Sequence, residues 1–204
     1  MSGIFLRPAQ RKPTFMKLYF RLLWSLFLAI WQTRKGQRLI EFPDGESALW
    51  FRVWPTDCDI NFHMTHSRYG ALSDIGRLDY AIRAGLGKTV RQEKWSAMMA
   101  GYQIEFRREI KPFERFVMRT RFLGWEGTNA LAEQTFYVLR DGEELIAARA
   151  LARAGFYSRE KREFVTIDEI ADKLGYTDGS PTLGETENTF IKARLTPSKN
   201  RPAP

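Results

Sequence analysis

The chain has 204 residues, a single cysteine and a formal net charge of +8, a length that fits one domain of about 130 to 150 residues with appendages. The lone Cys58 excludes an internal disulfide and favours a reducing compartment. The charge does not indicate a nucleic-acid groove, because residues 1–38 hold eight Lys and Arg and no Asp or Glu while the rest of the chain is balanced.

The N-terminal residues 1–38 are both basic and apolar. Their uncharged run, residues 22–33, is well short of the ~20 apolar residues that span a bilayer, and no small-residue cleavage site follows it. One interpretation is a helix in the interface of an anionic membrane, with Trp24 and Trp31 at headgroup depth. The alternatives are an arm packed on the domain or on a partner subunit, and a short signal anchor.

A strand followed by a long helix comes next. Residues 49–53 alternate apolar and polar side chains, and Pro55 ends the pairing. From Ser67 to Leu86 the apolar residues recur at steps of three and four, which predicts an amphipathic helix.

Four strand-like segments follow the helix, at residues 95–109, 116–125, 129–140 and 143–158. The first of them alternates in a way that predicts a long strand with one buried face. Asp141-Gly142 separates the last two segments, and this dipeptide is a strong signal for a tight antiparallel hairpin.

The last strand carries a row of small side chains on one face, Ala148, Ala150, Ala152 and Ala154. Such a row lets another element approach the sheet closely, and the long helix is the candidate. The sequence therefore predicts an α+β fold, a curved antiparallel sheet wrapped around one central helix. A short helix at 166–174 and a polar, mobile tail from Thr177 complete the chain.

The strand-to-helix loop concentrates polar chemistry. Residues 57–69 hold two aspartates, an asparagine, a tyrosine and both histidines of the chain. Turn formation alone explains any one of these residues, and two histidines beside an acidic loop go beyond a turn. Backbone N–H groups at the start of the helix favour negative charge, so the loop is a candidate oxyanion site. Cys58, between Asp57 and Asp59, is a poor nucleophile because both carboxylates raise the pKa of its thiol.

The pattern Asp-x-Asp-x-Asn-x-His-Met before a long helix, with four antiparallel strands after it, resembles the hotdog-fold acyl-CoA thioesterases of the 4-hydroxybenzoyl-CoA thioesterase-like group. The loop is also similar to that of plant acyl-ACP thioesterases. The N-terminal segment resembles that of the subgroup related to thioesterase superfamily member six. The resemblance covers about residues 46–160.

The resemblance implies a role for each loop residue. Asp59 matches the family's nucleophile or general base, Asn61 and His63 match the polar pair beside it, and Tyr69 matches the aromatic that lines the thioester site. Backbone N–H groups near Thr65 would stabilise the oxyanion. The chain has Thr65-His66 where the family has Asn-Asn, and this departure puts the geometry of the loop in question.

The implied function is hydrolysis of an acyl-CoA or acyl-carrier-protein thioester by a homodimer or homotetramer, without a metal or cofactor. Two other readings stay open: a non-catalytic acyl-binding or membrane-associated scaffold, and an enoyl hydratase of the MaoC type. The hydratase needs a longer spacing than Asp59 to His63 provides. The strand arginines 119, 121, 149 and 153 would either meet the phosphates of coenzyme A or lie on a solvated face.

Three parts follow from these predictions. Residues 1–40 form the basic, hydrophobic segment, 41–160 the hotdog domain, and 161–204 the short helix and polar tail. The expected localisation is cytoplasmic, with peripheral membrane contact through residues 1–38 under the membrane interpretation.

Overall fold

The computed structural model describes residues 23–24, 27, 29–33 and 39–193. Its elements, in chain order, are β1 (Glu46–Arg52), η1 (Pro55–Asp57), α2 (His66–Arg83), α3 (Leu86–Gln92), β2 (Trp95–Phe106), β3 (Arg115–Glu126), β4 (Asn129–Arg140), β5 (Glu143–Ser158), β6 (Glu163–Val165), α4 (Ile167–Lys173) and α5 (Glu185–Lys192). The long helix and the four predicted strands are all present. Two helices, α3 and α5, were not predicted.

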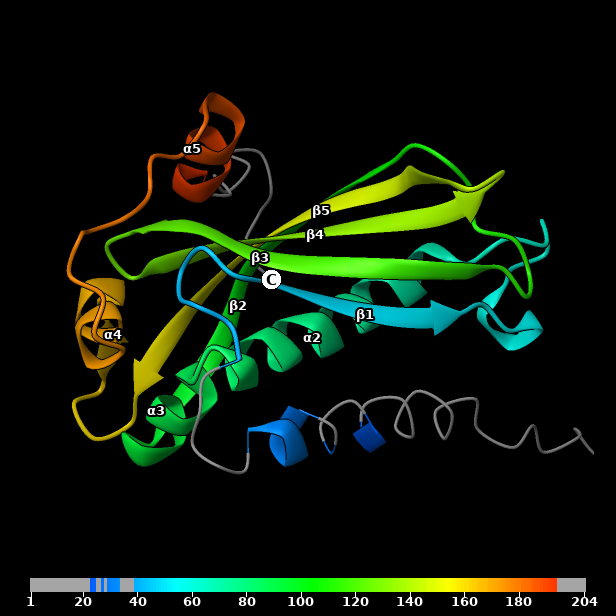
Figure 1. Ribbon diagram of the computed structural model, residues 1–204. Coiled ribbons are helices and arrows are strands. Elements are labelled where there is room, and N and C mark those ends of the chain that lie inside the picture. The colour runs from blue at the N-terminus through cyan, green and yellow to red at the C-terminus, as the bar shows by residue number, and fades with distance from the viewer. Residues whose placement is uncertain (1–22, 25–26, 28, 34–38, 194–204) are drawn as a thin grey trace, which may run out of the picture.

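The strands form one antiparallel sheet in the order β1-β3-β4-β5-β2, with β6 paired to β5. Helix α2 runs along one face of the curved sheet, and α5 lies on the opposite face (Figure 1). The prediction of an α+β fold in which a curved sheet wraps around one helix is confirmed. Strand β2 lies at the edge of the sheet, so one of its sides has no neighbouring strand among the described residues.

The main core lies between α2 and the centre of the sheet. Apolar side chains from α2, among them Leu72 and Ile75, pack against Phe116, Met118 and Phe136 of β3 and β4. All five are buried. Burial of such side chains stabilises the fold by about 1.5–3 kcal/mol each, and it fixes the helix axis against the strands that carry the loops.

The hairpin between β4 and β5 forms at Asp141-Gly142 as predicted. Both residues have positive φ, 53° and 82°, the combination that a two-residue turn needs to match the twist of its strands. The alanine row of β5 faces α2, as expected. Between the C-terminal half of α2 and this row there is a cavity, which Ala152 and Ala154 line.

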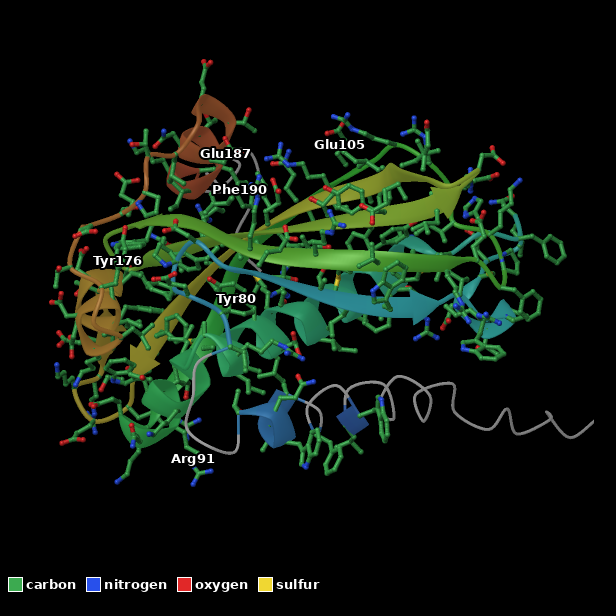
Figure 2. The ribbon with its side chains drawn as sticks, in the orientation of Figure 1. Tyr80, Arg91, Glu105, Tyr176, Glu187 and Phe190 are labelled. Carbon is green, nitrogen blue, oxygen red and sulfur yellow. The ribbon has the colours of Figure 1, made fainter. Side chains whose placement is uncertain are left out.

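Two sequence expectations need correction. Strand β2 was predicted to bury one face, but Met98 and Phe106 remain about half exposed because β2 is an edge strand. A polar, mobile tail was predicted from Thr177, but residues 185–192 form the helix α5. Arg149 pairs with Glu187, and Arg153 donates to the carbonyl of Phe190 at 3.1 Å; Figure 2 shows both α5 residues on the side of the helix that faces the sheet.

Most of the predicted N-terminal segment lies outside the described residues. The described part includes helical residues whose large side chains are at least half exposed, namely Leu23, Trp24, Phe27, Ile30 and Trp31, whereas Ala29 is buried. Within the portion of the chain that is described, no helix has both the length and the apolar character needed to cross a membrane.

Candidate active site

The loop between η1 and α2 is closed by its own backbone. The N–H of Asp59 donates to the carbonyl of His63 at 3.1 Å, and the N–H of Phe62 donates to the carbonyl of Asp59 at 3.2 Å. Phe62 takes a left-handed conformation, with φ 57°, to make this turn. A β-bridge between Cys58 and Met64 closes the loop's base. These bonds bring Asp59 and His63 side by side although both lie outside regular secondary structure.

The carboxylate of Asp59 is fixed at one oxygen and accessible at the other. Its Oδ1 accepts the backbone N–H of Asn61 at 2.9 Å. Its Oδ2 lies 3.6 Å from Nδ1 of His63, and the two side chains are 32% and 34% exposed. An oriented carboxylate beside an imidazole, still open to solvent, can act as a nucleophile or as a general base.

Helix α2 begins beside this pair. Thr65 is its N-cap residue with an extended backbone (ψ 144°), and its side chain makes no capping hydrogen bond. The first N–H groups of a helix have no partner within the helix, and the helix dipole adds partial positive charge there. Asp59, His63 and His66 line a hollow of about 390 Å³ at this point. Negative charge that develops in the hollow is therefore favoured.

Tyr69 forms the inner wall of the hollow. Its ring packs edge to face on Phe106 and Phe136, with both centroids 5.0 Å away. Burial, and then the nearby charge of Glu114, raises the pKa of its phenol. The hydroxyl of Tyr69 therefore stays neutral and can donate a hydrogen bond at neutral pH.

The structure gathers some of the predicted site residues and not others. Asp59, His63 and Tyr69 line one hollow. Asn61 is exposed, and its backbone N–H, not its side chain, donates to the carboxylate of Asp59. Thr65 contributes the start of the helix.

The surroundings of Asp57 and Cys58 fit a structural role for these two residues. The carboxylate of Asp57 is buried, accepts the N–H of Trp54 at 3.0 Å, and lies 3.4 Å from Nε of Arg68. Burial raises the pKa of the Cys58 thiol, and the charges of Asp57 and Asp59 raise it further, as the sequence predicted. Asp57 therefore shapes the turn, and Cys58 is a poor nucleophile.

Sequence reasoning missed the basic rim of the hollow. Arg107 and Arg108, at the end of β2, line it together with Glu109. Nη1 of Arg108 also donates to the carbonyl of Ile146 at 2.9 Å. The only signal in the sequence is an arginine doublet at the end of a strand, just before Lys111-Pro112.

The arginines that the sequence did single out do not line this hollow. Arg119 pairs with Glu144, and Arg121 and Arg149 pair with Glu133. Arg153 donates to carbonyl groups at the end of α5. These contacts fasten α5 and neighbouring strands.

A metal ion in a protein needs several ligating side chains held close together. Among the residues that the structure describes, no group of three or more His, Cys, Asp and Glu side chains is placed to hold an ion.

Comparisons with known proteins identify similar sequences. The chain is 36% identical over 101 residues to Protein THEM6 of Xenopus laevis, which covers 50% of this chain and 48% of the relative. The matched stretch thus spans about half the length of that relative. This chain is also 24% identical over 193 residues to the probable thioesterase YBR096W of Saccharomyces cerevisiae. That match covers 82% of this chain and 84% of the relative.

Solved structures show the same fold. A mutant of 4-hydroxybenzoyl CoA thioesterase, complexed with 4-hydroxybenzoyl CoA, superposes with a TM-score of 0.57 at 14% identity, over 63% of this chain and 97% of that one. The curved sheet around α2 is therefore the hotdog fold. A profile of the Thioesterase-like superfamily matches residues 53–174, from η1 and the candidate loop through α4, and the chain belongs to that superfamily.

Proposed function

We propose that the protein hydrolyses an acyl thioester and that Asp59 carries the reaction. The observation that supports this most directly is the placement of its carboxylate, oriented by the N–H of Asn61 at 2.9 Å, in a hollow at the N-terminus of α2. In the nucleophilic route, Asp59 attacks the thioester carbonyl and the thiolate leaves, which forms a mixed anhydride that water then hydrolyses. In the general-base route, Asp59 takes a proton from water, which attacks the carbonyl directly.

The helix start would stabilise the tetrahedral intermediate common to both routes. Backbone donors aimed at such an oxyanion contribute about 3–4 kcal/mol in comparable sites. His63, 3.6 Å from Asp59, is placed to hydrogen-bond the carboxylate or the departing thiolate. Tyr69 would face the acyl group.

We propose coenzyme A as the thiol carrier rather than a carrier protein. Arg107 and Arg108 line the hollow, and guanidinium groups match phosphate oxygens in charge and geometry.

We further propose that the protein acts as a homodimer or homotetramer. Strand β2 is the edge of the sheet and leaves Met98, Met99 and Phe106 about half exposed. An exposed edge strand with apolar side chains invites pairing with a second copy. A sedimentation measurement of the purified protein tests this, and a monomer at micromolar concentration contradicts it.

Membrane contact through residues 1–38 is a separate proposal. It rests on the basic charge of this segment and on the exposed side chains of Trp24, Phe27, Ile30 and Trp31. Amphipathic segments of this kind bind the interface of anionic bilayers.

A panel of acyl-CoA and enoyl-CoA thioesters tests the proposed reaction against its rivals. We expect release of free thiol. Loss of the enoyl absorbance without thiol release would indicate a hydratase, and tight binding without turnover would indicate an acyl-binding scaffold.

A further inference from the structure

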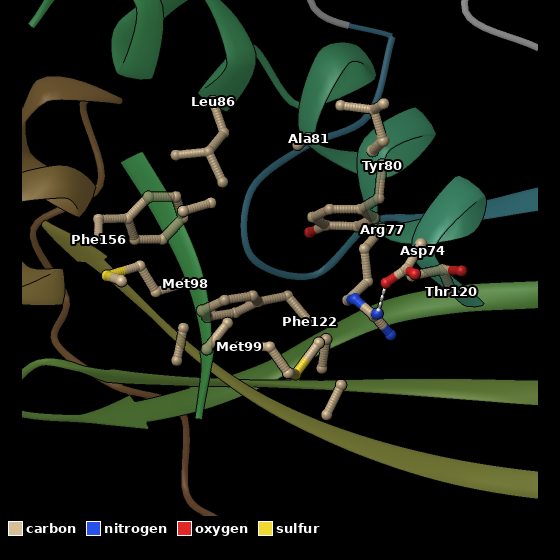
Figure 3. Close-up of a pocket in the computed structure, with 16 residues that line it drawn as sticks. Asp74, Arg77, Tyr80, Ala81, Leu86, Met98, Met99, Thr120, Phe122 and Phe156 are labelled. Carbon is tan, nitrogen blue, oxygen red and sulfur yellow. Dashed lines mark hydrogen bonds and ion pairs between the residues drawn. The ribbon is translucent and has the colours of Figure 1, made fainter. Parts of the chain in front are cut away.

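A second hollow lies between the C-terminal half of α2 and the sheet, apart from the candidate active site. It is a cavity of about 340 Å³. Its walls are mainly apolar, formed by Met98, Phe122 and Phe156 and by the small side chains of Ala130, Ala152 and Ala154 (Figure 3). An apolar chain fits such a space.

The two hollows lie along the same side of α2. Tyr69 lines the outer hollow and packs on Phe106 of β2. One turn further along the helix, the hydroxyl of Ser73 lies 3.0 Å from that of Tyr102, also on β2. Another turn on, Arg77 lines the inner cavity and its guanidinium lies over the ring of Tyr102, 5.8 Å from the centroid. The outer hollow, the Ser73–Tyr102 bond and the inner cavity therefore follow one another along the same side of α2.

One wall of the inner cavity is polar. Thr120 lines this wall, and Gln134 is its cross-strand partner on the neighbouring strand; the two side chains are 1% and 0% exposed. Oε1 of Gln134 accepts a hydrogen bond from Arg77 at 3.3 Å. Within the described part of the chain, Oγ1 of Thr120 and Nε2 of Gln134 have no hydrogen-bond partner.

Two adjacent buried polar atoms without partners are unusual. Each unsatisfied buried group destabilises the fold, so native proteins keep such groups rare. The helix cannot supply a partner at Thr120, because a Cβ added at Gly76 would come within 2.6 Å of its Oγ1 and the contact there is already tight. Thr120 lines the cavity, so an occupant of the cavity can supply a partner for its hydroxyl.

The charges on this wall favour a neutral partner. Arg77 pairs with Asp74, and burial lowers the pKa of the Arg77 guanidinium despite that pairing. The positive charge of Arg77 is thus already paired with Asp74. A carboxylate on the ligand would be repelled by Asp74 and would find no unpaired cation at this wall. A hydroxyl or ketone oxygen can form a hydrogen bond with the hydroxyl of Thr120.

We propose that the inner cavity binds the distal part of an acyl chain that carries a neutral oxygen, a hydroxyl or oxo group, recognised by the hydroxyl of Thr120. This inference rests on the proposed thioester function, whose reaction lies in the outer hollow. Gly76, above Thr120, is ten residues beyond His66, which corresponds to roughly 15 Å along the helix. The recognised oxygen is therefore far from the thioester carbonyl, in the distal half of the chain.

Calorimetric titration of the full-length protein with free fatty acids tests this without any turnover. The probes are a medium-chain fatty acid with a hydroxyl group in its distal half, the matching oxo acid, the unsubstituted acid and the α,ω-dicarboxylic acid. We expect the hydroxy or oxo acid to bind at least about tenfold more tightly than the unsubstituted acid, the gain from satisfying buried polar groups. Equal affinities, no binding of any probe, or tightest binding of the dicarboxylic acid would overturn the proposal.

Variants locate the preference. Thr120→Val keeps the side-chain volume and removes the hydroxyl. It should reduce the preference for the hydroxy or oxo acid over the unsubstituted acid to about twofold or less, without lowering the affinity for the unsubstituted acid. Thr120→Ser should retain the preference, and Thr135→Val, a buried threonine on the neighbouring strand, should leave it unchanged. A preference that survives Thr120→Val contradicts the assignment.

The two proposals fail separately. Selective binding of the oxygenated acid by a protein that hydrolyses no thioester would remove the proposed function and keep the inner site. Hydrolysis with no selectivity among these acids would do the reverse.

Discussion

The backbone N–H of Trp54 donates to Oδ2 of Asp57 at 3.0 Å, and this bond fixes the turn that leads into the candidate loop. Oδ1 of the same carboxylate lies 3.4 Å from Nε of Arg68 on α2. Asp57 thus joins the end of β1 to the first turn of the helix. The neighbouring acidic residue, Asp59, faces the hollow instead.

Replacing Asp57 should therefore reduce stability more than rate. Asp57→Ala should lower the free energy of unfolding by about 1.5–3 kcal/mol, the usual contribution of a buried hydrogen bond to a charged group. Urea denaturation measures this, and Asp57→Asn, which keeps an acceptor oxygen, should lose less. A large fall in kcat without a change in stability would move Asp57 into the reaction.

The ion pair between Glu114 and Arg140 should make stability depend on pH. The carboxylate accepts two hydrogen bonds of 3.0 Å from Arg140 and the N–H of Lys111 at 2.7 Å. Burial alone would raise the pKa of Glu114, but these bonds outweigh it and lower that pKa. A lowered carboxyl pKa stabilises the fold above the ordinary value, about 4.3, and this contribution is lost as the pH falls through the lowered value.

The measurement is the difference in unfolding free energy between the native protein and Glu114→Gln. We expect the native protein to be more stable at pH 7 and the difference to shrink as the pH falls from about 5 toward 3. Glu143→Gln, at the exposed hairpin end, is the matched control. A difference that stays constant over this range would contradict the linkage.

Arg107 should contribute to binding of coenzyme A. Arg107→Gln should raise KM for an acyl-CoA by roughly fivefold, the effect of about 1 kcal/mol from a partly screened charge pair. It should leave KM unchanged for the same acyl group on a pantetheine fragment that lacks the nucleotide phosphates. Arg115→Gln, an exposed arginine outside the hollow, is the control, and equal effects on both substrates would exclude phosphate contact.

The N-terminal tryptophans should determine binding to anionic vesicles. Trp24 and Trp31 are 54% and 56% exposed, so the double change to Ser should weaken sedimentation with anionic vesicles, and added salt should weaken binding of the native protein. Trp50→Ser removes a tryptophan that is 60% exposed on β1 and serves as the control. A double variant that aggregates or changes oligomeric state, while vesicle binding persists, would identify the segment as a packing arm.

Much of the fold was predictable because its signals are local. The turn at Asp141-Gly142 dictates the hairpin between β4 and β5, and the three- and four-residue spacing of apolar side chains dictates α2. Both depend on neighbours in the sequence. The sheet around the helix then follows from the alternation of the strands.

The two missed helices depend on distant contacts. Helix α3 has seven residues and buries only Leu86, too little to show a periodic pattern. Helix α5 is polar and buries only Ile191. Its position comes from pairs such as Arg149 with Glu187, which join residues far apart in the sequence.

The site divides in the same way. Asp59 and His63 were predictable as neighbours because one short loop carries both. Arg107 directly follows β2, Thr120 lies on β3 and Gln134 lies on β4. Only the folded sheet brings these three residues close to α2. Sequence patterns cannot show which of many strand residues lie beside that helix.

The central claim is that the carboxylate of Asp59 drives thioester hydrolysis, and one comparison tests it most directly. Free-thiol release from an acyl-CoA is measured for the native protein, for Asp59→Asn and for Asp141→Asn, a change of the same type at the distant hairpin turn. We predict that Asp59→Asn lowers kcat by more than about 100-fold with an unchanged unfolding midpoint, and that Asp141→Asn keeps native turnover. Near-native turnover in Asp59→Asn would contradict the claim and remove this carboxylate from the mechanism.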